Sequence, residues 1–415
     1  MSALHFYQNR QMELFAAKET KRLTLRQLIF FGRSMNEERL VKSANYVRSE
    51  LTVRIAHRLR DMQALPYIVV TQDEVAKVYD LYWTAFDKFR SFPPITTMAE
   101  NIKFCTFVRG LLNEHASVIP ALSLGFTFSS PYMPSDQLDS FMSRMLVSRI
   151  SRRVLAEHHI ALTEDFIKGS TKGRPGRGAL TRNASTHVGI IQTELSPKAS
   201  IERCVDLLRK YPSSVIYRDP ENPDSKNVPC PRVVVDGHVD TTFAYIREQF
   251  EYIIFELLKN ALYATSYRHR NETTPPEIRA TISTGSEEVQ VRISDQGGGL
   301  LEPDISSPSD LFSFSATRNM MRMEDDRIEA LRKTILSPHG MRATVDEQLE
   351  RWHERDPENV ASTGPLPRLG IGLPMSNIFA TYFGGSLRLV SLDGWGTDVH
   401  LKLPKLGTKL EGVEV

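Results

Sequence analysis

Hydrophobic positions follow two different periods along this chain, and the change of period divides it in two. Over about the first 170 residues, apolar side chains recur at three- and four-residue steps, as on amphipathic helices. Beyond that point, short stretches alternate apolar and polar residues as strands do, with helical patterns between them. The pattern therefore predicts a helical region followed by a mixed α/β region.

Three helices of the first region stand out by one apolar stripe each. The stripes are Val75, Val78, Tyr79, Tyr82, Phe86 and Phe89; Ile102, Phe104, Phe107, Val108, Leu111 and Leu112; and Phe141, Met142, Met145, Leu146, Ile150 and Val154. Helices with a single apolar face must cover one another, so we predict a four-helix bundle over residues 1–167.

The second region, residues 186–415, has strand-like alternation in three places, at Val289, Val291 and Ile293, at Leu387 and Leu389, and at Val399, Leu401 and Leu403. Helical patterns cover about 200–210, 242–267 and 374–382. A sheet covered on one face by helices is a two-layer α/β sandwich, so the predicted fold class is α+β. Between the regions, residues 168–185 form a linker whose stretch 168–182 carries five cations. We interpret it as a flexible, solvated loop and keep a docking role as the alternative.

Composition excludes several classes of protein. Hydrophobic residues make up 41% of the 415 residues, which is enough for packed cores and atypical of a disordered chain. A net charge of only +2 provides no overall field for nucleic acid. Cys105, Cys204 and Cys230 lie far apart, as in a reducing compartment. No apolar run is long enough to span a membrane, and with Glu13 and Glu19 in the first 27 residues we expect no secretory or transit segment there.

The mixed region carries a helix whose polar residues can do chemistry. Tyr252, Glu256, Asn260 and Tyr263 fall on one narrow stripe of an otherwise apolar helix. A carboxylate there can act as a base, and an amide oxygen one turn later can bind Mg²⁺. The same residues are also compatible with a helix-capping acid and a surface asparagine.

Three glycine-rich turns follow this helix and favour the chemical interpretation. Asp295 ends a strand and is placed to accept a hydrogen bond from an adenine amino group. Without side chains, the glycine backbone can lie flat beneath the adenine base. The backbone amides of such a turn and of the helix that follows can bind phosphates. The residues concerned are Gly297, Gly299, Gly370 and Gly372, the last two just before Leu373 and a helix, and Thr397 through its hydroxyl near Asp295. Together they predict a pocket for Mg²⁺ and ATP.

This order of motifs resembles the GHKL ATP-binding superfamily, and within it the mitochondrial pyruvate and branched-chain 2-oxoacid dehydrogenase kinases. The resemblance covers nearly the whole chain. In the helical region it is carried by residues 32–34, 51–58, 65–66, 92–95, 148–151 and 155–162, and beyond the linker by 189–191 and 195–198. The residues around Arg54 to Arg58 and at His158 and His159 are closer to the branched-chain kinase.

The resemblance implies a protein serine kinase of the mitochondrial matrix. It would transfer the ATP γ-phosphate to the α subunit of the first enzyme of a 2-oxoacid dehydrogenase complex and so inactivate that enzyme. Glu256 would be the general base, Asn260 the Mg²⁺ ligand, and Asp295 and Thr397 the residues that select adenine. Lys259 would neutralise charge or orient Glu256.

Further sites follow from the same resemblance. A pocket for small 2-oxoacid regulators would be formed by Tyr82, His115, Arg149 and Arg153, although an arginine pair on the bundle surface is the alternative. The lipoyl domain of the acyltransferase core would dock on Leu23, Leu28, Phe31 and Tyr46, which could equally belong to the bundle core. The family also implies a homodimer.

Several positions depart from the family pattern. Tyr252 stands where pyruvate kinases have a histidine, and Arg368 replaces a glycine of the phosphate turn. A long lid is predicted at about 306–369, with helical stretches near 323–335 and 344–354. The chain end lacks the Asp-Trp pair of the pyruvate kinases.

Two other functional classes stay open at this level. A sensor histidine kinase would use His158 or His159 as phosphate acceptor, and a scaffold would bind ATP without catalysis. The sequence also leaves the choice between pyruvate and branched-chain dehydrogenase undecided.

Overall fold

The structure is a computed structural model with two compact units. It describes residues 3–129, 132–171, 186–211, 230–300, 308–314, 331–332, 334–335, 341, 344–353 and 370–405. The first unit consists of residues 1–191, 314–341 and 410–415, and the second of residues 192–313 and 342–409. Most of the predicted basic loop, Arg368 and much of the predicted lid lie outside the described residues. Among the helices that are described, none combines the length and apolar character that crossing a bilayer requires.

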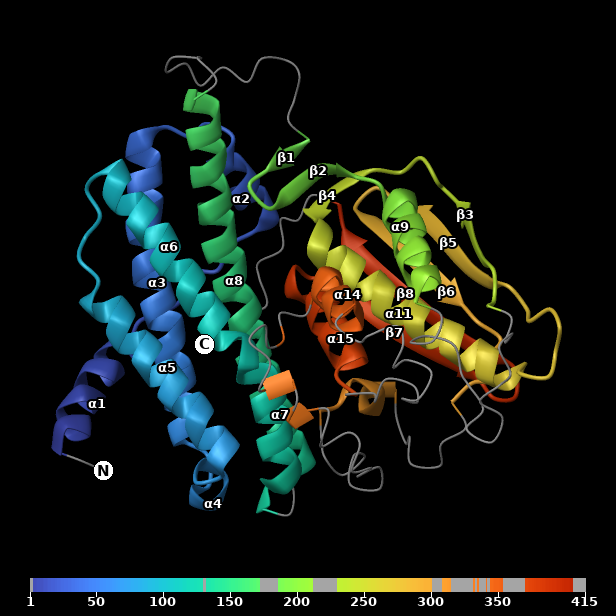
Figure 1. Cartoon of the computed structure of the whole chain (residues 1–415), viewed down its shortest axis with the longest axis horizontal. Coiled ribbons are helices and arrows are strands. Elements are labelled where there is room, and N and C mark those ends of the chain that lie inside the picture. The colour runs from blue at the N-terminus through green and yellow to red at the C-terminus, as the bar shows by residue number, and fades with distance from the viewer. Residues whose placement is uncertain are drawn as a thin grey trace. The chain divides into compact units, whose positions relative to one another are not determined.

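Helices build the first unit (Figure 1). They are α1 (Ala3–Ala16), α2 (Leu25–Gly32), α3 (Glu37–Gln63), α4 (Tyr67–Val70), α5 (Asp73–Ser91), α6 (Met98–Glu114), the 3-10 turn η1 (His115–Ser117), α7 (Val118–Ser129) and α8 (Ser135–Thr171), followed by the short strand β1 (His187–Val188). Helix α3 packs against α5, α6 and α8, and α6 packs against α8. The predicted four-helix bundle is therefore confirmed, with α3, α5, α6 and α8 as its long members.

Local capping explains where two of these helices begin. Thr24 precedes α2 and forms a reciprocal capping box with Gln27. Thr97 does the same with Glu100 before α6. Each box satisfies backbone N–H groups that a helix start leaves without an intrahelical partner. The sequence thus fixes these starts locally, before any packing is considered.

A buried arginine ties the centre of the bundle together. Arg54 on α3 is only 1% exposed and donates to the Ser151 hydroxyl on α8 at 2.5 Å and to the Lys21 carbonyl at 2.8 Å. Glu50, one turn earlier on α3, lies 3.5 Å from its guanidinium. Because a buried charge is costly unless it is paired and hydrogen-bonded, this set of partners specifies how α3 and α8 pack.

A buried histidine joins three helices of the same bundle. His159 on α8 is 2% exposed. Its Nδ1 lies 3.0 Å from the Ser43 hydroxyl on α3, and its Nε2 lies 2.9 Å from the Asn101 amide oxygen on α6. The neighbouring His158 is 4% exposed. Burial lowers the pKa of each of these imidazoles to about 4, so both are neutral at physiological pH.

The second unit contains a five-stranded mixed sheet of order β3-β5-β6-β8-β7. Its strands are β3 (Val233–Gly237), β5 (Ile278–Thr284), β6 (Glu288–Ser294), β7 (Ser386–Leu392) and β8 (Gly396–Pro404). Strands β3 and β5 are parallel, and the other neighbours are antiparallel. Two further strands are β2 (Ile191–Leu195) and β4 (Phe243–Ile246), which neighbour one another. The helices are α9 (Pro197–Lys210), α11 (Arg247–Arg268), the 3-10 turn η3 (Pro308–Phe312), α14 (Val345–His353) and α15 (Gly372–Tyr382).

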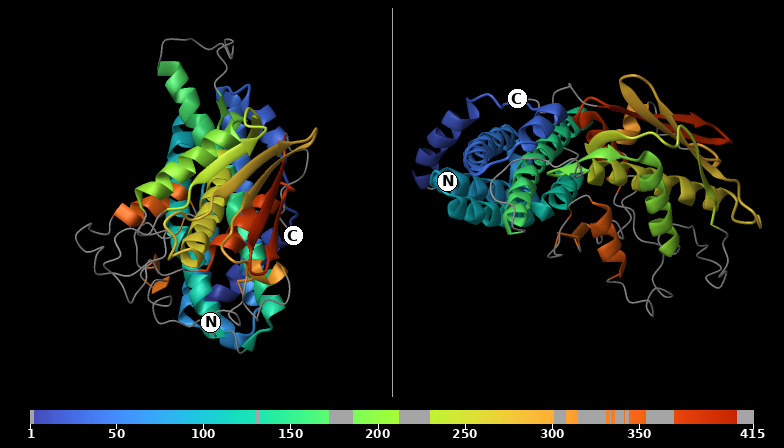
Figure 2. Two further views of the ribbon diagram at one scale, coloured as in Figure 1. Left: turned by 90° about the vertical axis from the view of Figure 1, so that its right-hand side faces the viewer. Right: turned by 90° about the horizontal axis from the view of Figure 1, so that it is seen from above.

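One face of this sheet carries the core of the second unit. Val291 of β6 is paired with Leu401 of β8 and Ile282 of β5, and all three are buried. Arg292 and Asp398, on the opposite face, form an ion pair at 2.7 Å. Helices α9 and α11 lie along the buried face (Figure 2). The predicted alternation and the two-layer sandwich are confirmed.

The predicted helix from about 242 to 267 is wrong at its beginning. Residues Phe243–Ile246 form β4, and α11 begins only at Arg247. All four residues of β4 are buried, so they give an unbroken apolar run. Such a run does not distinguish a buried strand from the first turn of a buried helix.

The buried histidines should make stability depend on pH. In the unfolded chain the pKa of His159 returns to about 6.5, so the unfolded state takes up a proton that the folded state resists. Stability therefore falls as pH decreases from about 6.5 towards 4, by about 2 kcal/mol per histidine at pH 5. We expect His159→Gln, which keeps polar atoms at the site, to lose less stability between pH 8 and pH 5 than the wild type does. Denaturant unfolding followed by circular dichroism measures this difference. The exposed His187→Gln is the matched control, and equal losses in wild type and His159→Gln would contradict the prediction.

Candidate functional site

Helix α11 buries a carboxylate and supplies one of its partners. Glu256 is 4% exposed. The Lys259 ammonium, one turn later, donates to Glu256 Oε1 at 2.7 Å. The amide of Gln348, on α14, donates from Nε2 to the same oxygen, also at 2.7 Å. Lys259 also donates to Gln348 Oε1 at 3.1 Å, so the three side chains form a closed ring of hydrogen bonds. The structure thus brings together two of the predicted residues and adds a third that the sequence did not indicate.

The first turn of α15 lies directly against this carboxylate. A Cβ atom on Gly372 would stand 2.1 Å from Glu256 Oε2, a separation that real side chains do not tolerate. Any side chain at this position would therefore displace the Glu256 carboxylate or the start of α15. The cap residue Ile371 makes no side-chain hydrogen bond to this end of the helix. The N-terminal amides of α15 consequently lie near the buried Glu256 carboxylate, and a helix start of this kind suits an anionic group such as a phosphate.

A second cluster forms around Asp295, directly after β6. Asp295 is 7% exposed, and its Oδ1 accepts hydrogen bonds from the backbone N–H of Gly297 at 2.8 Å and of Thr397 at 3.3 Å. Among the described residues, Asp295 Oδ2 has no hydrogen-bond donor. Thr397 therefore contacts Asp295 as predicted, but through its backbone amide and not through the expected hydroxyl.

Burial raises the pKa of Asp295 to about 6, because the charged form loses hydration. The two backbone N–H donors lower this pKa and the nearby Asp398 raises it, both by less than burial does. At neutral pH the carboxylate is mostly ionised and can accept a hydrogen bond at Oδ2. The cost of keeping this charge buried indicates a role other than stability.

Glycines hold the loop after Asp295 in close contact with its neighbours. A Cβ on Gly297 would meet the Ala264 side chain of α11 at 2.5 Å. Gly299 has φ of +80°, and a Cβ there would meet the Leu392 carbonyl at 2.8 Å. The Ser391 hydroxyl accepts from the Leu300 N–H at 2.8 Å. The loop is thereby fixed against both α11 and the turn that joins β7 to β8.

The two clusters lie at a definite spacing along α11. Glu256 belongs to the first cluster, and Ala264, eight residues later, contacts the loop of the second. Eight residues of α-helix correspond to about 12 Å along the axis. Asn260 lies between them and is half-buried. An extended nucleoside triphosphate can span such a distance, with its base near Asp295 and its last phosphate near Glu256.

The donor set near Asn260 suits Mg²⁺ held mainly by phosphate. Within the described part of the chain, no three His, Cys, Asp or Glu side chains are placed to hold a metal ion. Mg²⁺ commonly takes only one or two protein ligands and completes its shell with phosphate oxygens and water. A single amide oxygen on the exposed side of α11 fits this mode of binding.

The remaining predicted nucleotide contacts occupy the expected elements. Gly370 has φ of +71° in the turn before α15, a conformation that glycine adopts readily. Leu373 is half-buried in the first turn of α15. Tyr252, one of the positions that depart from the family pattern, is 1% exposed, and its ring packs edge to face on Phe379 of α15 at 5.2 Å. It helps to fix the position of α15 relative to α11.

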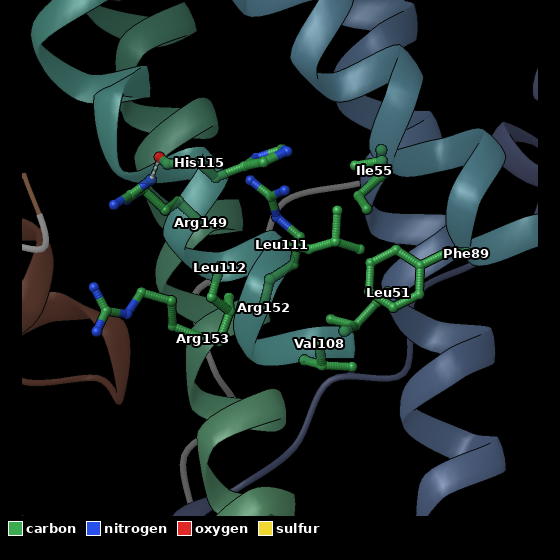
Figure 3. A pocket seen from close by; sticks show the side chains of 11 residues that line it. Leu51, Ile55, Phe89, Val108, Leu111, Leu112, His115, Arg149, Arg152 and Arg153 are labelled. Atoms are coloured by element: carbon green, nitrogen blue, oxygen red, sulfur yellow. Dashed lines mark hydrogen bonds between the residues drawn. The ribbon is translucent and has the colours of Figure 1, made fainter. Parts of the chain in front are cut away.

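A separate cavity lies inside the bundle of the first unit. Its lining comes from α3, α5, α6, η1 and α8 and consists of Leu51, Ile55, Ala85, Phe89, Val108, Leu111, Leu112, His115, Arg149, Arg152 and Arg153. Three of the four predicted regulatory residues therefore line one cavity (Figure 3). Arg149 donates to the His115 carbonyl and, at 2.7 Å, to that of Met341.

The fourth predicted residue, Tyr82, acts through a neighbour that the sequence did not indicate. Tyr82 is fully buried, and its hydroxyl accepts from Arg152 at 2.5 Å, while its ring lies 5.0 Å from that of His115. Arg152 is 7% exposed, and among the described residues it has no carboxylate partner. By contrast, Arg153 pairs with Glu157 at 2.6 Å and points away from the apolar wall formed by Leu51 and Phe89 (Figure 3). The cavity thus contains a buried cation available to an anion.

Burial lowers the pKa of His115 well below its usual value, and the nearby Arg152 and Arg149 lower it further. His115 is therefore neutral, and its Nε2 has no hydrogen-bond partner among the described residues. A neutral imidazole beside guanidinium groups can donate to a carboxylate without adding a further buried charge.

The predicted docking residues differ in exposure. Phe31 on α2 is 40% exposed, whereas Leu28 is only 6% exposed and belongs to the bundle core. Leu23 and Tyr46 are half-buried. Phe30, which was not predicted, is 80% exposed beside Phe31. The sequence pattern thus indicated one member, Phe31, of an exposed aromatic pair on α2 and missed the other, Phe30.

Gln348 and Arg152 were missed for different reasons. Gln348 lies in a stretch that was correctly predicted to be helical, but a single glutamine on a charged helix has no diagnostic pattern. Arg152 lies just after the segment 148–151, on a helix where Arg149, Arg152 and Arg153 follow one another closely. All three line the cavity, and only the packing of α8 in the bundle determines which partner each guanidinium meets.

Two family models match this chain, one in the helical region and one in the mixed region. Residues 22–192 match the family described as mitochondrial branched-chain alpha-ketoacid dehydrogenase kinase. Residues 246–407 match the histidine kinase-, DNA gyrase B- and HSP90-like ATPase family.

Similar full-length proteins include the mitochondrial pyruvate dehydrogenase (acetyl-transferring) kinase of Arabidopsis thaliana, with 27% identity over 94% of this chain and 92% of the relative. Kinase 2 of Saccharomyces cerevisiae has 25% identity over 97% and 86%. Human isozyme 1 has 26% identity over 96% and 80%. All three are named as mitochondrial kinases. The bundle, the nucleotide-binding motifs and these relatives together show that the chain is a protein kinase of the mitochondrial pyruvate and branched-chain 2-oxoacid dehydrogenase kinase family, within the GHKL ATP-binding superfamily.

Proposed function

We propose that this protein transfers the γ-phosphate of ATP to a serine on the α subunit of the first enzyme of a mitochondrial 2-oxoacid dehydrogenase complex, and thereby inactivates it. One observation carries the proposal. The base Glu256 and the N-terminus of α15 meet at one position along α11, and the buried acceptor Asp295 is held near a second position about 12 Å away. This arrangement suits a nucleotide whose terminal phosphate lies beside a proton acceptor.

The residues of the second unit divide the work of the reaction. Glu256 accepts the proton of the serine hydroxyl as that oxygen attacks phosphorus. The amides at the start of α15 orient the phosphates, and Lys259 holds the base and adds positive charge nearby. Asn260 would hold Mg²⁺, which supplies neutralisation of the phosphate charge when bound. Because phosphoryl transfer depends mainly on positioning and charge, this small set is sufficient.

The comparisons point to two different dehydrogenases as substrate. The helical region matches the branched-chain kinase family, whereas the similar full-length proteins named above are pyruvate dehydrogenase kinases. We therefore propose the 2-oxoacid dehydrogenase class as substrate and test both members. Each purified complex is incubated with ATP and this kinase, and the loss of dehydrogenase activity is compared. Loss of activity in neither complex would refute the proposed function.

We propose that the bundle cavity binds small 2-oxoacid regulators. A 2-oxoacid has a carboxylate for Arg149 and Arg152 and a short apolar chain for the wall that contains Leu51 and Phe89. The buried guanidinium of Arg152, with Tyr82 and a backbone carbonyl as its hydrogen-bond partners, favours an anionic ligand. Arg153 also lines the cavity, but its guanidinium is paired with Glu157 and is less available to the ligand than that of Arg152.

We also propose that the lipoyl domain of the acyltransferase core docks on α2, where Phe30 and Phe31 are exposed. Matrix localisation and a homodimer remain predictions from the family.

The alternative of a sensor histidine kinase is not supported by the surroundings of its two candidate acceptors. His158 and His159 are both buried, and His159 is engaged on both ring nitrogens. A phosphate acceptor must reach a nucleotide. A non-catalytic scaffold would bind ATP and fail the substitution test that follows.

Replacing the base should separate binding from chemistry. We expect Glu256→Gln to reduce phosphate incorporation into the α subunit by a factor of about 100 or more, because general-base assistance is lost. Calorimetry should still detect nucleotide binding within about threefold of the wild-type affinity, since a base that acts on the second substrate contributes little to ground-state binding. Glu248→Gln, exposed on the same helix, serves as the control. Undiminished phosphorylation would remove Glu256 from the mechanism.

Burial of the ionised Asp295 carboxylate should lower the free energy of unfolding at neutral pH. Its pKa is about 6 in the folded chain and 3.8 in the reference state, so the folded carboxylate binds its proton more tightly and stability falls as pH rises from about 4 to about 6. We expect Asp295→Asn to raise the free energy of unfolding at pH 7.5 by up to about 3 kcal/mol and to show no gain near pH 4. The same variant should weaken adenine nucleotide binding by about tenfold or more, because Oδ2 is replaced by a donor. The exposed Asp393→Asn is the control, and a destabilised variant at pH 7.5 would contradict the prediction.

Removing the buried cation should desensitise the kinase to regulators. We expect Arg152→Met and Arg149→Ala each to raise the concentration of 2-oxoacid needed for half inhibition by about tenfold or more, because a charge-assisted contact is lost. Kinase assays over a range of 2-oxoacid concentrations measure this. Arg144→Met, on the same helix and outside the cavity lining, should leave the inhibition curve unchanged. Unchanged curves for both cavity variants would discard the regulatory site.

A further inference from the structure

Helix α14 contacts both α9 and α11 of the second unit. Val345 is 5% exposed. Asp346 lies 3.5 Å from the guanidinium of Arg203 on α9, and Arg203 also pairs with the buried Glu251 of α11 at 3.1 Å. Gln348, two residues after Asp346 on the same helix, is thereby placed against α11.

Both polar atoms of the Gln348 amide are used at that place. Nε2 donates to Glu256 Oε1 at 2.7 Å, and Oε1 accepts from Lys259 Nζ at 3.1 Å. A flipped amide would set oxygen against the carboxylate and nitrogen against the ammonium, so the charges on α11 determine its orientation.

The two oxygens of Glu256 are consequently in different environments. Oε1 accepts from both Lys259 and Gln348. Oε2 has no donor among the described residues, and it faces Gly372 at the start of α15. An oxygen that already accepts two hydrogen bonds is a poorer proton acceptor than one that accepts none.

We propose that Gln348 is a positioning residue for the base, resting on the proposed function of Glu256: it holds Oε1 so that Oε2 faces the phosphate end of the site and takes the serine proton there. The bond from the serine oxygen to hydrogen breaks, the proton passes to Oε2, and the oxygen forms its bond to phosphorus while the bond to the leaving diphosphate breaks. The role of a base-orienting partner thereby belongs to a residue on α14, outside the motif of α11.

The same contact has a competing interpretation. If α14 blocked the base, releasing Gln348 would speed the reaction. The direction of the rate change therefore distinguishes positioning from inhibition.

The kinetic test uses two substitutions of one residue. Gln348→Met keeps the length of the side chain and removes both hydrogen bonds. We expect kcat for phosphorylation of the α subunit to fall by about tenfold to a hundredfold, with KM for ATP within about twofold, because misplacement of a reacting group affects the chemical step. Gln348→Glu still accepts from Lys259 but cannot donate to Glu256 and adds a like charge, so kcat should fall further. Glu350→Gln, exposed on the same helix, should retain the wild-type kcat. A higher kcat in Gln348→Met, or wild-type kcat in Gln348→Glu, would overturn the proposal.

A stability cycle tests the contact without any assay of activity. We expect Gln348→Met to lower the unfolding midpoint by about 3 to 6 °C in the wild-type background, as loss of a hydrogen bond to a charged group does. In the Glu256→Met background the same change should lower the midpoint by about half as much, because the acceptor of Nε2 is already absent and only the hydrogen bond from Lys259 is lost. Equal shifts in the two backgrounds would show that Gln348 does not act through Glu256. Absence of kinase activity in the wild type, with the cycle as expected, would refute the proposed function and leave the contact established.

Discussion

The burial of one carboxylate on α11 is the constraint on which the second unit depends. Glu256 is almost inaccessible to water, and removing a partner from a buried charge typically costs about 3–5 kcal/mol. Its hydrogen-bond partners come from two helices, Lys259 from α11 and Gln348 from α14, and the start of α15 packs against it at Gly372. The requirement to satisfy this single group therefore brings together the elements from which the site is built.

The site carries a second buried charge at its other end, and the two charges are handled differently. Glu256 has a cation and an amide as partners. Within the described residues Asp295 accepts from two backbone N–H groups and from no side chain, and burial raises its pKa to about 6. A carboxylate with this little compensation retains hydrogen-bonding capacity for a ligand. If Asp295 binds the nucleotide as proposed, the site is maintained at the expense of folding stability.

The helical unit uses buried charge for a different purpose. Arg54 is surrounded by hydrogen-bond acceptors from its own bundle, so it specifies packing. Arg152 has a tyrosine hydroxyl and a backbone carbonyl, and it lines a cavity with an apolar wall. The difference between the two arginines lies in their acceptors and not in their burial, since both are less than a tenth exposed. A small anion is the natural complement of the second arrangement.

The sequence by itself determined the fold class, the bundle helices, the sheet strands and the order of the nucleotide motifs. Period and capping are local properties, and glycines such as Gly297 and Gly372 mark close approaches whatever their partners. It could not separate β4 from α11, because an apolar run has no period that distinguishes strand from helix.

Only the tertiary structure decided which side chains meet. Gln348 reaches Glu256 across 92 positions of sequence, Arg152 meets Tyr82 because of the packing of α8, and Thr397 contacts Asp295 by its backbone. Each of these contacts depends on how whole helices and strands are seated on one another. That seating is set by burial summed over many residues, and no short motif encodes it.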